Sequence, residues 1–311
     1  FKNMSKFAIY NYNFLRIIEP NEEHQLEFPD WENVNVKESF ENRQQLLEEL
    51  LLADFEKPFP FENARKKPYW HIQIVKPQDN VYVMRVANVT NVTITDEHLL
   101  SQKYADYRNC LVIIDNRPGI QRIAIEQKTM AFSHTKTVAN ILEASFCKLL
   151  KCKLLKVKLS AVYGTNVFWE TLGKYPKGFS KVTFHFPHLN LDRLTKVMDK
   201  YLTTAREDWD SDLDFTFGAN EGGAVKIDRN NQRQTALIAG ASGAGAWIKM
   251  LPKGEKGKAI LCGKDQYVVR ELDSEVFNDL AIGAQPLPGM GQSAMDKVKV
   301  FMKDMPEVFT H

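Results

Sequence analysis

Residues 110–158 read CLVIIDNRPGIQRIAIEQKTMAFSHTKTVANILEASFCKLLKCKLLKVK, and this stretch decides the fold. Two short runs of apolar β-type residues, 111–114 and 123–125, flank a turn that contains Pro118 and Gly119. A Pro-Gly pair at the centre of a turn predicts type II geometry, so the two runs should form an antiparallel hairpin. The amphipathic pattern that follows predicts a helix that begins near Ser133 or Thr135 and ends among lysines.

Toward the N-terminus, the hydrophobic pattern changes from strand to helix and back to strand. We expect Ser39 to cap a helix that extends to about residue 54. Residues 96–109 contain DEHLLSQKYADYRN, for which we expect a short helix or an irregular connection. The expected strands on this side of the hairpin are 5–18, 70–76, 80–87 and 89–95.

Toward the C-terminus, we expect a strand over 154–162 and, after a soft boundary near residue 178, a region rich in strands. Helices are expected over 190–206 and 293–304. The remaining expected strands are 181–186, 213–218, 224–228, 235–239, 246–250, 258–262 and 266–271. Long helices separated by runs of short strands predict an α+β fold with mainly antiparallel sheets. We divide it into an N-terminal α+β portion, 4–178, and a β-rich C-terminal portion with one helix, 179–311.

Composition bounds the class of protein. With 44% hydrophobic and 26% charged residues among 311, the chain has globular composition and enough length for a sizeable core. The formal net charge of +2 neither requires nor excludes a polyanionic partner. No apolar run is long enough to span a membrane. The four cysteines lie in apolar runs without a Cys-x-x-Cys pair, so we expect reduced, buried thiols in an intracellular, cytoplasmic protein.

Three charged residues of the hairpin suggest a specific chemistry. Asp115 ends the first run, and Glu126 and Lys128 follow the second. An Asp at a strand end, then Glu-x-Lys, then a helix resembles the core of the restriction-endonuclease-like nucleases. The resemblance implies that Asp115 and Glu126 hold Mg²⁺, which activates water, and that Lys128 assists the attack.

Turn chemistry supports a different interpretation of the same residues. A type II turn over Arg117–Ile120 places Asp115 opposite Arg122, and Glu126 then lies about 13 Å farther along the strand. Asp115 and Arg122 would form a cross-strand ion pair, with Glu126 and Lys128 on a solvated face. Both interpretations remain open from the sequence.

A series of lysines, called here the lysine ladder, follows the long helix. Its members interleave with apolar residues and are Lys148, Lys151, Lys153, Lys156 and Lys158. They could contact a phosphate backbone together with Arg117 and Arg122. They could equally be a solvated helix end and a charge-protected edge strand.

We therefore expect an intracellular nucleic-acid-binding protein, of a host-defence or nucleic-acid-processing system, that contacts the phosphates of DNA or RNA through the lysine ladder. The first alternative is a Mg²⁺-dependent nuclease that uses Asp115, Glu126 and Lys128. The second alternative is a non-catalytic protein-interaction or scaffold subunit, which apolar Phe168-Trp169 and the proline-rich segments favour.

Overall fold

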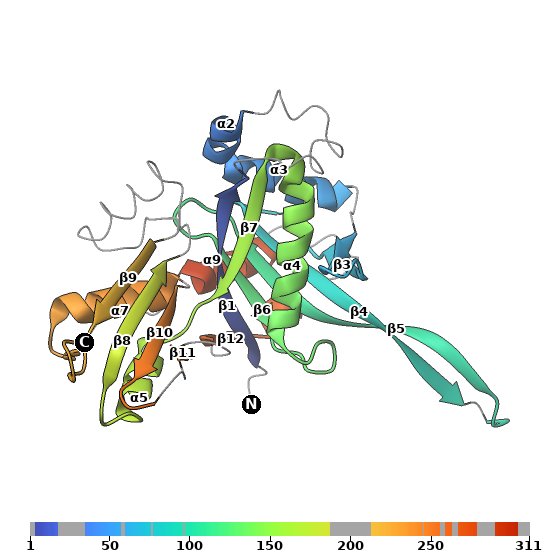
Figure 1. Ribbon diagram of the computed structural model, residues 1–311. Helices are drawn as coiled ribbons and strands as arrows, with labels where there is room; N and C mark the ends of the chain where they lie inside the picture. The colour runs from blue at the N-terminus through green and yellow to red at the C-terminus, as the bar shows by residue number, and fades with distance from the viewer. Residues whose placement is uncertain are drawn as a thin grey trace. The chain divides into compact units, whose positions relative to one another are not determined.

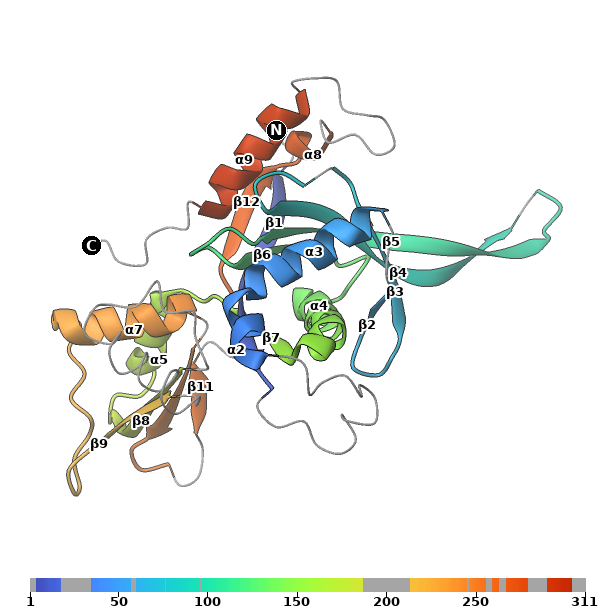
Figure 2. The ribbon, with the colours of Figure 1, turned by 90° about the horizontal axis from the view of Figure 1, so that it is seen from above.

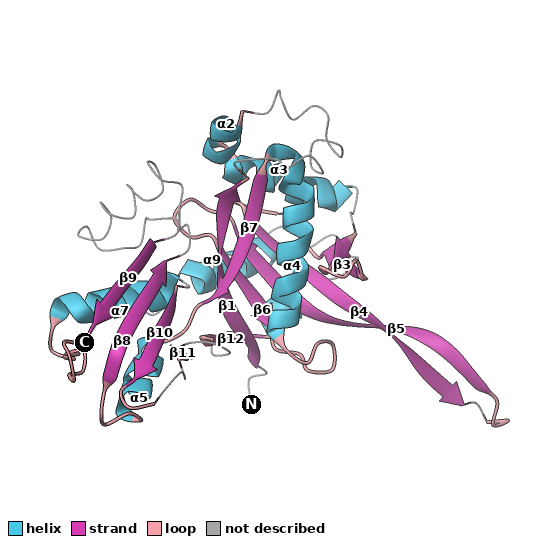
Figure 3. Cartoon of the chain, viewed as in Figure 1, coloured by secondary structure: helices cyan, strands magenta, loops and turns pink. Residues whose placement is uncertain are grey.

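The computed structural model describes residues 4–17, 35–56, 60–75, 77–95, 97–186, 213–244, 246–255, 259–262, 267–278 and 290–303. The helices and antiparallel sheets confirm the predicted α+β class (Figure 3). The chain forms two compact units. Of the described residues, unit 1 contains those within 4–8, 15–159 and 269–303, and unit 2 contains those within 9–14 and 160–268.

The larger sheet has the strand order β12-β1-β6-β5-β4-β3-β2, and β7 also pairs with β1. Its first and last strands in the chain are neighbours, because β1 pairs antiparallel with β12. Its strands are β1 (Met4–Arg16), β2 (Phe61–Glu62), β3 (Pro68–Gln73), β4 (Val81–Thr95), β5 (Ser101–Asp115), β6 (Arg122–Glu126), β7 (Leu155–Ala161) and β12 (Val269–Asp273).

The predicted hairpin is β5–β6. Ile120 N donates to Arg117 O at 3.0 Å, and Gly119 has φ 73°, as a type II turn requires at its third position. The register places Asp115 opposite Arg122. The strand register predicted from a type II turn over Arg117–Ile120 is therefore confirmed.

Helices cover both faces of this sheet within unit 1. On one face, Gln73 Nε2 donates to Leu51 O of α3 (Arg43–Glu56) at 2.6 Å. On the same face, Phe61 stacks on His71 and meets Phe146 of α4 (Thr135–Leu150) edge-on. The opposite face carries α8 (Glu275–Asn278) and α9 (Met290–Lys303), whose rings of Phe277 and Phe301 contact Phe7. Figures 1 and 2 show α4 and α9 on opposite sides of the sheet.

Strands β4 and β5 form the longest pairing of the molecule, from Val81↔Asp115 to Thr95↔Ser101. Beyond the part that pairs with β3 and β6, they continue as a two-stranded ribbon (Figures 1 and 2). We call residues 88–109 the arm. The predictions were wrong here in two ways: 80–87 and 89–95 form one strand, and 101–109 belong to β5.

Unit 2 has its own sheet of order β11-β10-β8-β9. The strands are β8 (Phe179–Phe186), β9 (Leu213–Gly218), β10 (Trp247–Pro252) and β11 (Ile260–Cys262), and the helices are α5 (Thr165–Gly173) and α7 (Gln232–Ala244). The sheet and both helices share one apolar core that includes Phe168, Phe184 and Ile238. The predicted strand over 235–239 was wrong, because it lies in helix α7, and residues 224–228 are not a strand.

Two other helices differ from expectation. The predicted helix over 39–54 is two helices, α2 (Val36–Glu41) and α3, and Asn35 rather than Ser39 caps the first by accepting from Glu38 N. The predicted helix over 190–206 lies outside the described residues. The C-terminal helix is confirmed as α9. Within the described ranges, none of the helices has the length and apolar character that a bilayer crossing requires.

All four cysteines are free thiols, but they are not uniformly buried. Cys110 and Cys262 are buried, Cys147 is partly buried, and Cys152 is exposed, which corrects the expectation of four buried thiols. Burial raises the pKa of Cys110 to about 12 and that of Cys262 to about 11. Burial also raises the pKa of Cys147.

We expect a thiol-specific reagent at neutral pH to modify Cys152 first in the native protein. Cys110 and Cys262 should react only after unfolding, because their thiolate forms are suppressed and their sulfur atoms are shielded. Mass spectrometry of the peptides after timed labelling measures this order. Rapid labelling of Cys110 in the folded chain would contradict the packing of β5.

Candidate functional site

Asp115 is fully buried at the end of β5, where the hairpin turn begins. Arg117, two residues later, binds both of its carboxylate oxygens: Nε donates to Oδ1 at 2.9 Å and Nη2 donates to Oδ2 at 2.6 Å. The backbone N–H of Arg117 also donates to Oδ1. This is a two-point charge-assisted pair of the kind that guanidinium forms best.

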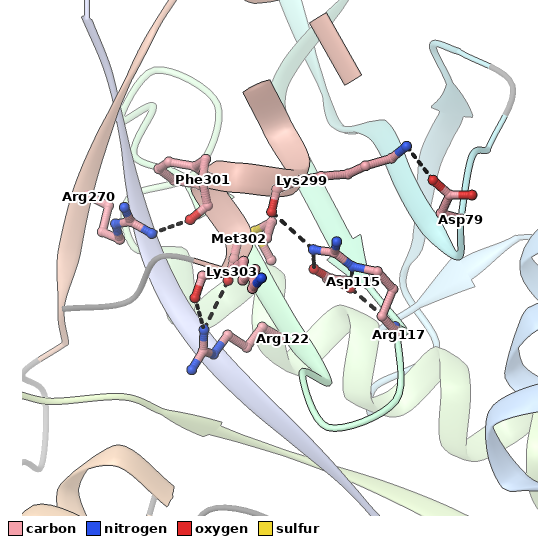
Figure 4. A network of polar contacts seen from close by, with 9 residues as sticks. All are labelled: Asp79, Asp115, Arg117, Arg122, Arg270, Lys299, Phe301, Met302 and Lys303. Atoms are coloured by element: carbon pink, nitrogen blue, oxygen red, sulfur yellow. Dashed lines mark hydrogen bonds and ion pairs between the residues drawn. The ribbon is translucent and has the colours of Figure 1, made fainter. Parts of the chain in front are cut away.

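The same guanidinium group reaches the last helix of the unit. Arg117 Nη2 donates to Lys299 O at 3.0 Å, and Arg122 Nη1 donates to Met302 O at 2.9 Å (Figure 4). Arg270 of β12 donates to Phe301 O. The last four carbonyls of a helix have no partner inside it, and the helix dipole makes this end negative. Arg122 and Arg270 therefore satisfy carbonyls of the last turn of α9, and with Arg117 they place three positive charges against the negative end of the helix.

One more contact holds the same helix. Lys299 Nζ binds the carboxylate of Asp79, a residue of the turn before β4 (Figure 4). The hydrogen bond and positive charge of Lys299 lower the pKa of Asp79. Asp115, Arg117 and Arg122 thus belong to a network that attaches α9 to the sheet.

Glu126 does not join Asp115. Its Oε2 accepts from Leu111 N at 3.0 Å, and its Oε1 accepts from Ser5 Oγ at 3.1 Å. Leu111 lies four residues before Asp115 on β5, which corresponds to about 13 Å along the strand. Strand β6 ends at Glu126, so exposed Lys128 lies in the following turn and does not share a strand face with it.

A metal-dependent nuclease needs both carboxylates at one metal ion. The register separates Asp115 from Glu126, and Arg117 occupies both oxygens of Asp115. In the described part of the chain, no group of three or more His, Cys, Asp or Glu side chains could hold a metal ion. The nuclease hypothesis stays a prediction from sequence, and the site geometry gives it no support.

The lysine ladder divides into paired and exposed members. Lys148 binds Glu62 at 2.9 Å, and Lys158 binds Glu143 at 2.8 Å. These pairs reduce the positive charge that a phosphate backbone would meet. Lys153 ends the short 3₁₀ helix η2 (Lys151–Lys153) and is exposed, as is Lys156 on β7.

A different feature stands out on the surface of unit 1. Strand β3 alternates exposed Trp70 and Ile72 with buried His71 and Gln73. The register Trp70↔Ala87 and Val89↔Tyr107 puts further apolar residues on the same face as Trp70. The exposed fractions are 62% for Trp70, 58% for Ile72, 37% for Val89 and 47% for Tyr107. We call these four residues the apolar strip.

The strip is continuous because its aromatic rings meet. The rings of Trp70 and Tyr107 lie 5.8 Å apart and nearly perpendicular, across the small side chain of Ala87 on β4. Toward the arm's tip, Ile94, Leu99, Leu100 and Tyr104 are also exposed. Contiguous exposed apolar surface of this kind marks interaction sites.

Unit 2 contains a small pocket lined by Phe168, Val182, Phe184, Phe217, Val225, Lys226, Ile227, Gln234, Leu237 and Ile238. Gln234 is already occupied, because it accepts from Asp228 N and donates to Lys226 O. Functional pockets combine apolar walls with convergent polar groups. The other polar residue of the lining, Lys226, is exposed and stands alone, so polar groups do not converge in this pocket and we place the candidate site on the apolar strip.

Sequence reasoning missed the strip. It needs β5 to extend back to Ser101, whereas residues 96–109 suggested a helix or an irregular connection. The alternation of Trp70, His71, Ile72 and Gln73 was the available signal for an outward apolar face. Phe168, which suggested a protein-binding surface, is instead buried in the core of unit 2, and the guanidinium of Arg229 lies over the ring of Trp169.

No protein-family model matches the sequence, and no curated protein shows significant similarity to it. The fold and the surface therefore carry the functional argument.

The Asp115–Arg117 pair gives a test of the structural role of Asp115. Asp115→Asn leaves the partly buried guanidinium without its counter-charge, and we expect the free energy of unfolding to fall by about 3 kcal/mol. Asp106→Asn is the matched control, since Asp106 pairs with Arg108 where both side chains are more than a third exposed. That change should cost less than about 1 kcal/mol.

Urea unfolding followed by circular dichroism, with and without Mg²⁺, measures both variants. The structural role predicts the same loss for Asp115→Asn in both conditions. Stabilisation of the unchanged protein by Mg²⁺ that Asp115→Asn abolishes would contradict it and favour a metal site.

Proposed function

We propose that this chain is a non-catalytic protein-interaction subunit that binds a polypeptide partner through the arm and the apolar strip at its base. The observation that carries the proposal is the exposed apolar surface formed by Trp70 and Ile72 on β3 together with Val89 and Tyr107 at the base of the projecting two-stranded arm. Burying aromatic and aliphatic side chains of this size is the main source of affinity in protein interfaces.

The charge of the arm favours a polypeptide over a nucleic acid. Residues 88–109 contain two basic residues, Lys103 and Arg108, against three acidic residues, Asp96, Glu97 and Asp106. Arg108 is paired with Asp106 at 2.7 Å. A surface that follows a phosphate backbone needs several unpaired cations, which this arm does not have.

Backbone geometry supports the same function. The described residues of β4 between Asn88 and Thr95 pair only with β5, so the outer edge of this strand is open among the described elements. This segment, NVTNVTIT, has neither a charged residue nor a proline. Edges without such protection are suited to receive another strand.

We expect the arm to be necessary for peptide binding and dispensable for folding. Replacing residues 89–107 with Asn-Gly would close the hairpin at Asn88 and Arg108, which face each other in the register. Random peptides displayed on phage, selected on the full chain, should bind it and should lose binding to the shortened chain. Fluorescence anisotropy with the selected synthetic peptides measures the loss.

Circular dichroism and the thermal midpoint of unfolding check that the shortened chain is folded. We expect it to fold, because the large apolar side chains that the change removes are exposed in the full chain. Two results would overturn the proposal: no peptide enriched on the full chain, or peptides that bind both chains equally.

A second candidate function is nucleic-acid binding through the lysine ladder. The observation in its favour is that Lys153 and Lys156 are both exposed where η2 leads into β7. Arg117 and Arg122 contact α9, and Lys148 and Lys158 are paired, so the contact surface is smaller than the sequence predicted.

If this second function holds, affinity for labelled duplex DNA should decrease steeply with salt, with a log–log slope of about −0.9 for each phosphate neutralised. The double change Lys153→Glu and Lys156→Glu should weaken binding and flatten the slope. Lys177→Glu, at an exposed position of unit 2, is the charge-matched control. Affinity that is indifferent to salt, or equally weakened by the control, would contradict nucleic-acid binding.

A further inference from the structure

Arg85 of β4 lies on the same face of the sheet as the apolar strip. It is opposite Ile72 of β3 on one side and opposite Leu111 of β5 on the other. Residues directly opposite in a ladder, and alternate residues along a strand, share a face. Arg85, Val89, Ile72, Trp70 and Tyr107 therefore belong to one surface.

The side chain of Arg85 is partly buried, and its Nε atom is shielded from solvent without a hydrogen-bond partner among the described residues. A guanidinium group is a strong donor in a fixed planar arrangement and prefers a carboxylate. Arg117 in the same unit shows the arrangement that a satisfied guanidinium adopts, with two donors on one carboxylate. Arg85 has the donors and lacks the acceptor.

The exposed charge that this face carries along the arm is also positive. Lys103 of β5 is opposite Thr93 of β4, and both residues lie on the face of Val89 and Tyr107. Over the paired residues of β3, β4 and β5, the one carboxylate on this face is that of Asp115, opposite Val81, which is buried and bound by Arg117. Asp106 lies on the opposite face, where it binds Arg108. The exposed part of this face is therefore apolar and positive.

We propose that the partner is a polypeptide segment with a carboxylate side chain adjacent to apolar side chains, and that Arg85 binds this carboxylate while the apolar strip covers its neighbours. The inference rests on the proposed protein-binding function and adds the chemistry of the partner. Arg85 sets specificity, because a segment without an acceptor leaves a partly desolvated guanidinium unsatisfied. Lys103 adds a longer-range attraction to an acidic segment.

A nucleic acid is the less suitable occupant. Trp70 and Tyr107 could stack on bases, but Ile72 and Val89 offer no stacking surface. Lys103 of β5 is opposite Thr93, which lies eight residues from Arg85 along β4, or about 26 Å. Two positive charges this far apart are too sparse to follow a phosphate backbone.

The test uses peptides selected from the random phage library on the full chain. We expect them to be enriched in Asp or Glu next to aromatic or aliphatic residues. Arg85→Gln should weaken their binding by about thirtyfold or more, as removal of one partner of a desolvated charge pair does. Arg65→Gln, a change at an exposed arginine of the same unit, should leave affinity unchanged.

A second measurement needs no change to the protein. The same peptides with Asn or Gln in place of their Asp or Glu should lose as much affinity as Arg85→Gln causes, and the two changes together should cost little more than either alone.

The possible results distinguish failure of this inference from failure of the proposed protein-binding function. Peptides that need the arm but carry no carboxylate, or that bind Arg85→Gln as tightly as the unchanged chain, overturn the inference and leave the protein-binding function standing. Peptides indifferent to arm shortening overturn both. An oligonucleotide that displaces the peptides and depends equally on Arg85 would show that the acceptor is a phosphate, which also overturns the inference.

Discussion

The attachment of α9 by three guanidinium groups is the interaction on which unit 1 depends. Arg117 and Arg122 come from the two sides of the central hairpin, and Arg270 comes from the last strand of the sheet. Arg122 and Arg270 bind carbonyls in the last turn, which a helix end leaves without internal partners, and buried carbonyls without partners are costly. Cations at this end also oppose the helix dipole. Local sequence at Arg117 and Arg122 thus helps to determine the position of a helix about 180 residues farther along the chain.

Asp115 belongs to this arrangement as the residue that orients Arg117. Its buried carboxylate binds Nε and Nη2, which directs the guanidinium so that Nη2 also reaches Lys299 O. Pairs of this kind contribute more to the uniqueness of packing than to net stability, because removing two charges from water offsets much of their attraction. Of the three residues that resemble a nuclease core, Asp115 therefore serves, in this geometry, to position a helix.

The sequence predicted the elements whose signals are local. Pro118 and Gly119 were sufficient for the turn and for its register, and the apolar face of α4 was evident from its period.

The predictions failed where local signals were mixed. The segment 101–109 has Tyr104 and Tyr107 three apart, which suggests a helix, but its pairing with β4 overrides that preference. The segment 235–239 has β-type residues, yet alanines and glycines around it allow α7 to pack closely in unit 2. The apolar strip and the α9 contacts could not be predicted, because each joins residues from strands or helices that only the completed sheet brings together.

The topology of the larger sheet has a consequence for synthesis of the chain. Strand β1 emerges from the ribosome before the other described strands of this sheet, and its antiparallel neighbour β12 is made only after more than 250 further residues. Until then the Met4–Ala8 part of β1 lacks its β12 neighbour, and Arg117 and Arg122 lack the carbonyls they bind in the finished fold. Most of unit 2 lies within 160–268, so its own four-stranded sheet is complete while that edge is still open. Pairing of β12 is therefore a late event relative to β1, and the nascent chain has to protect this edge of β1 while more than 250 further residues are made.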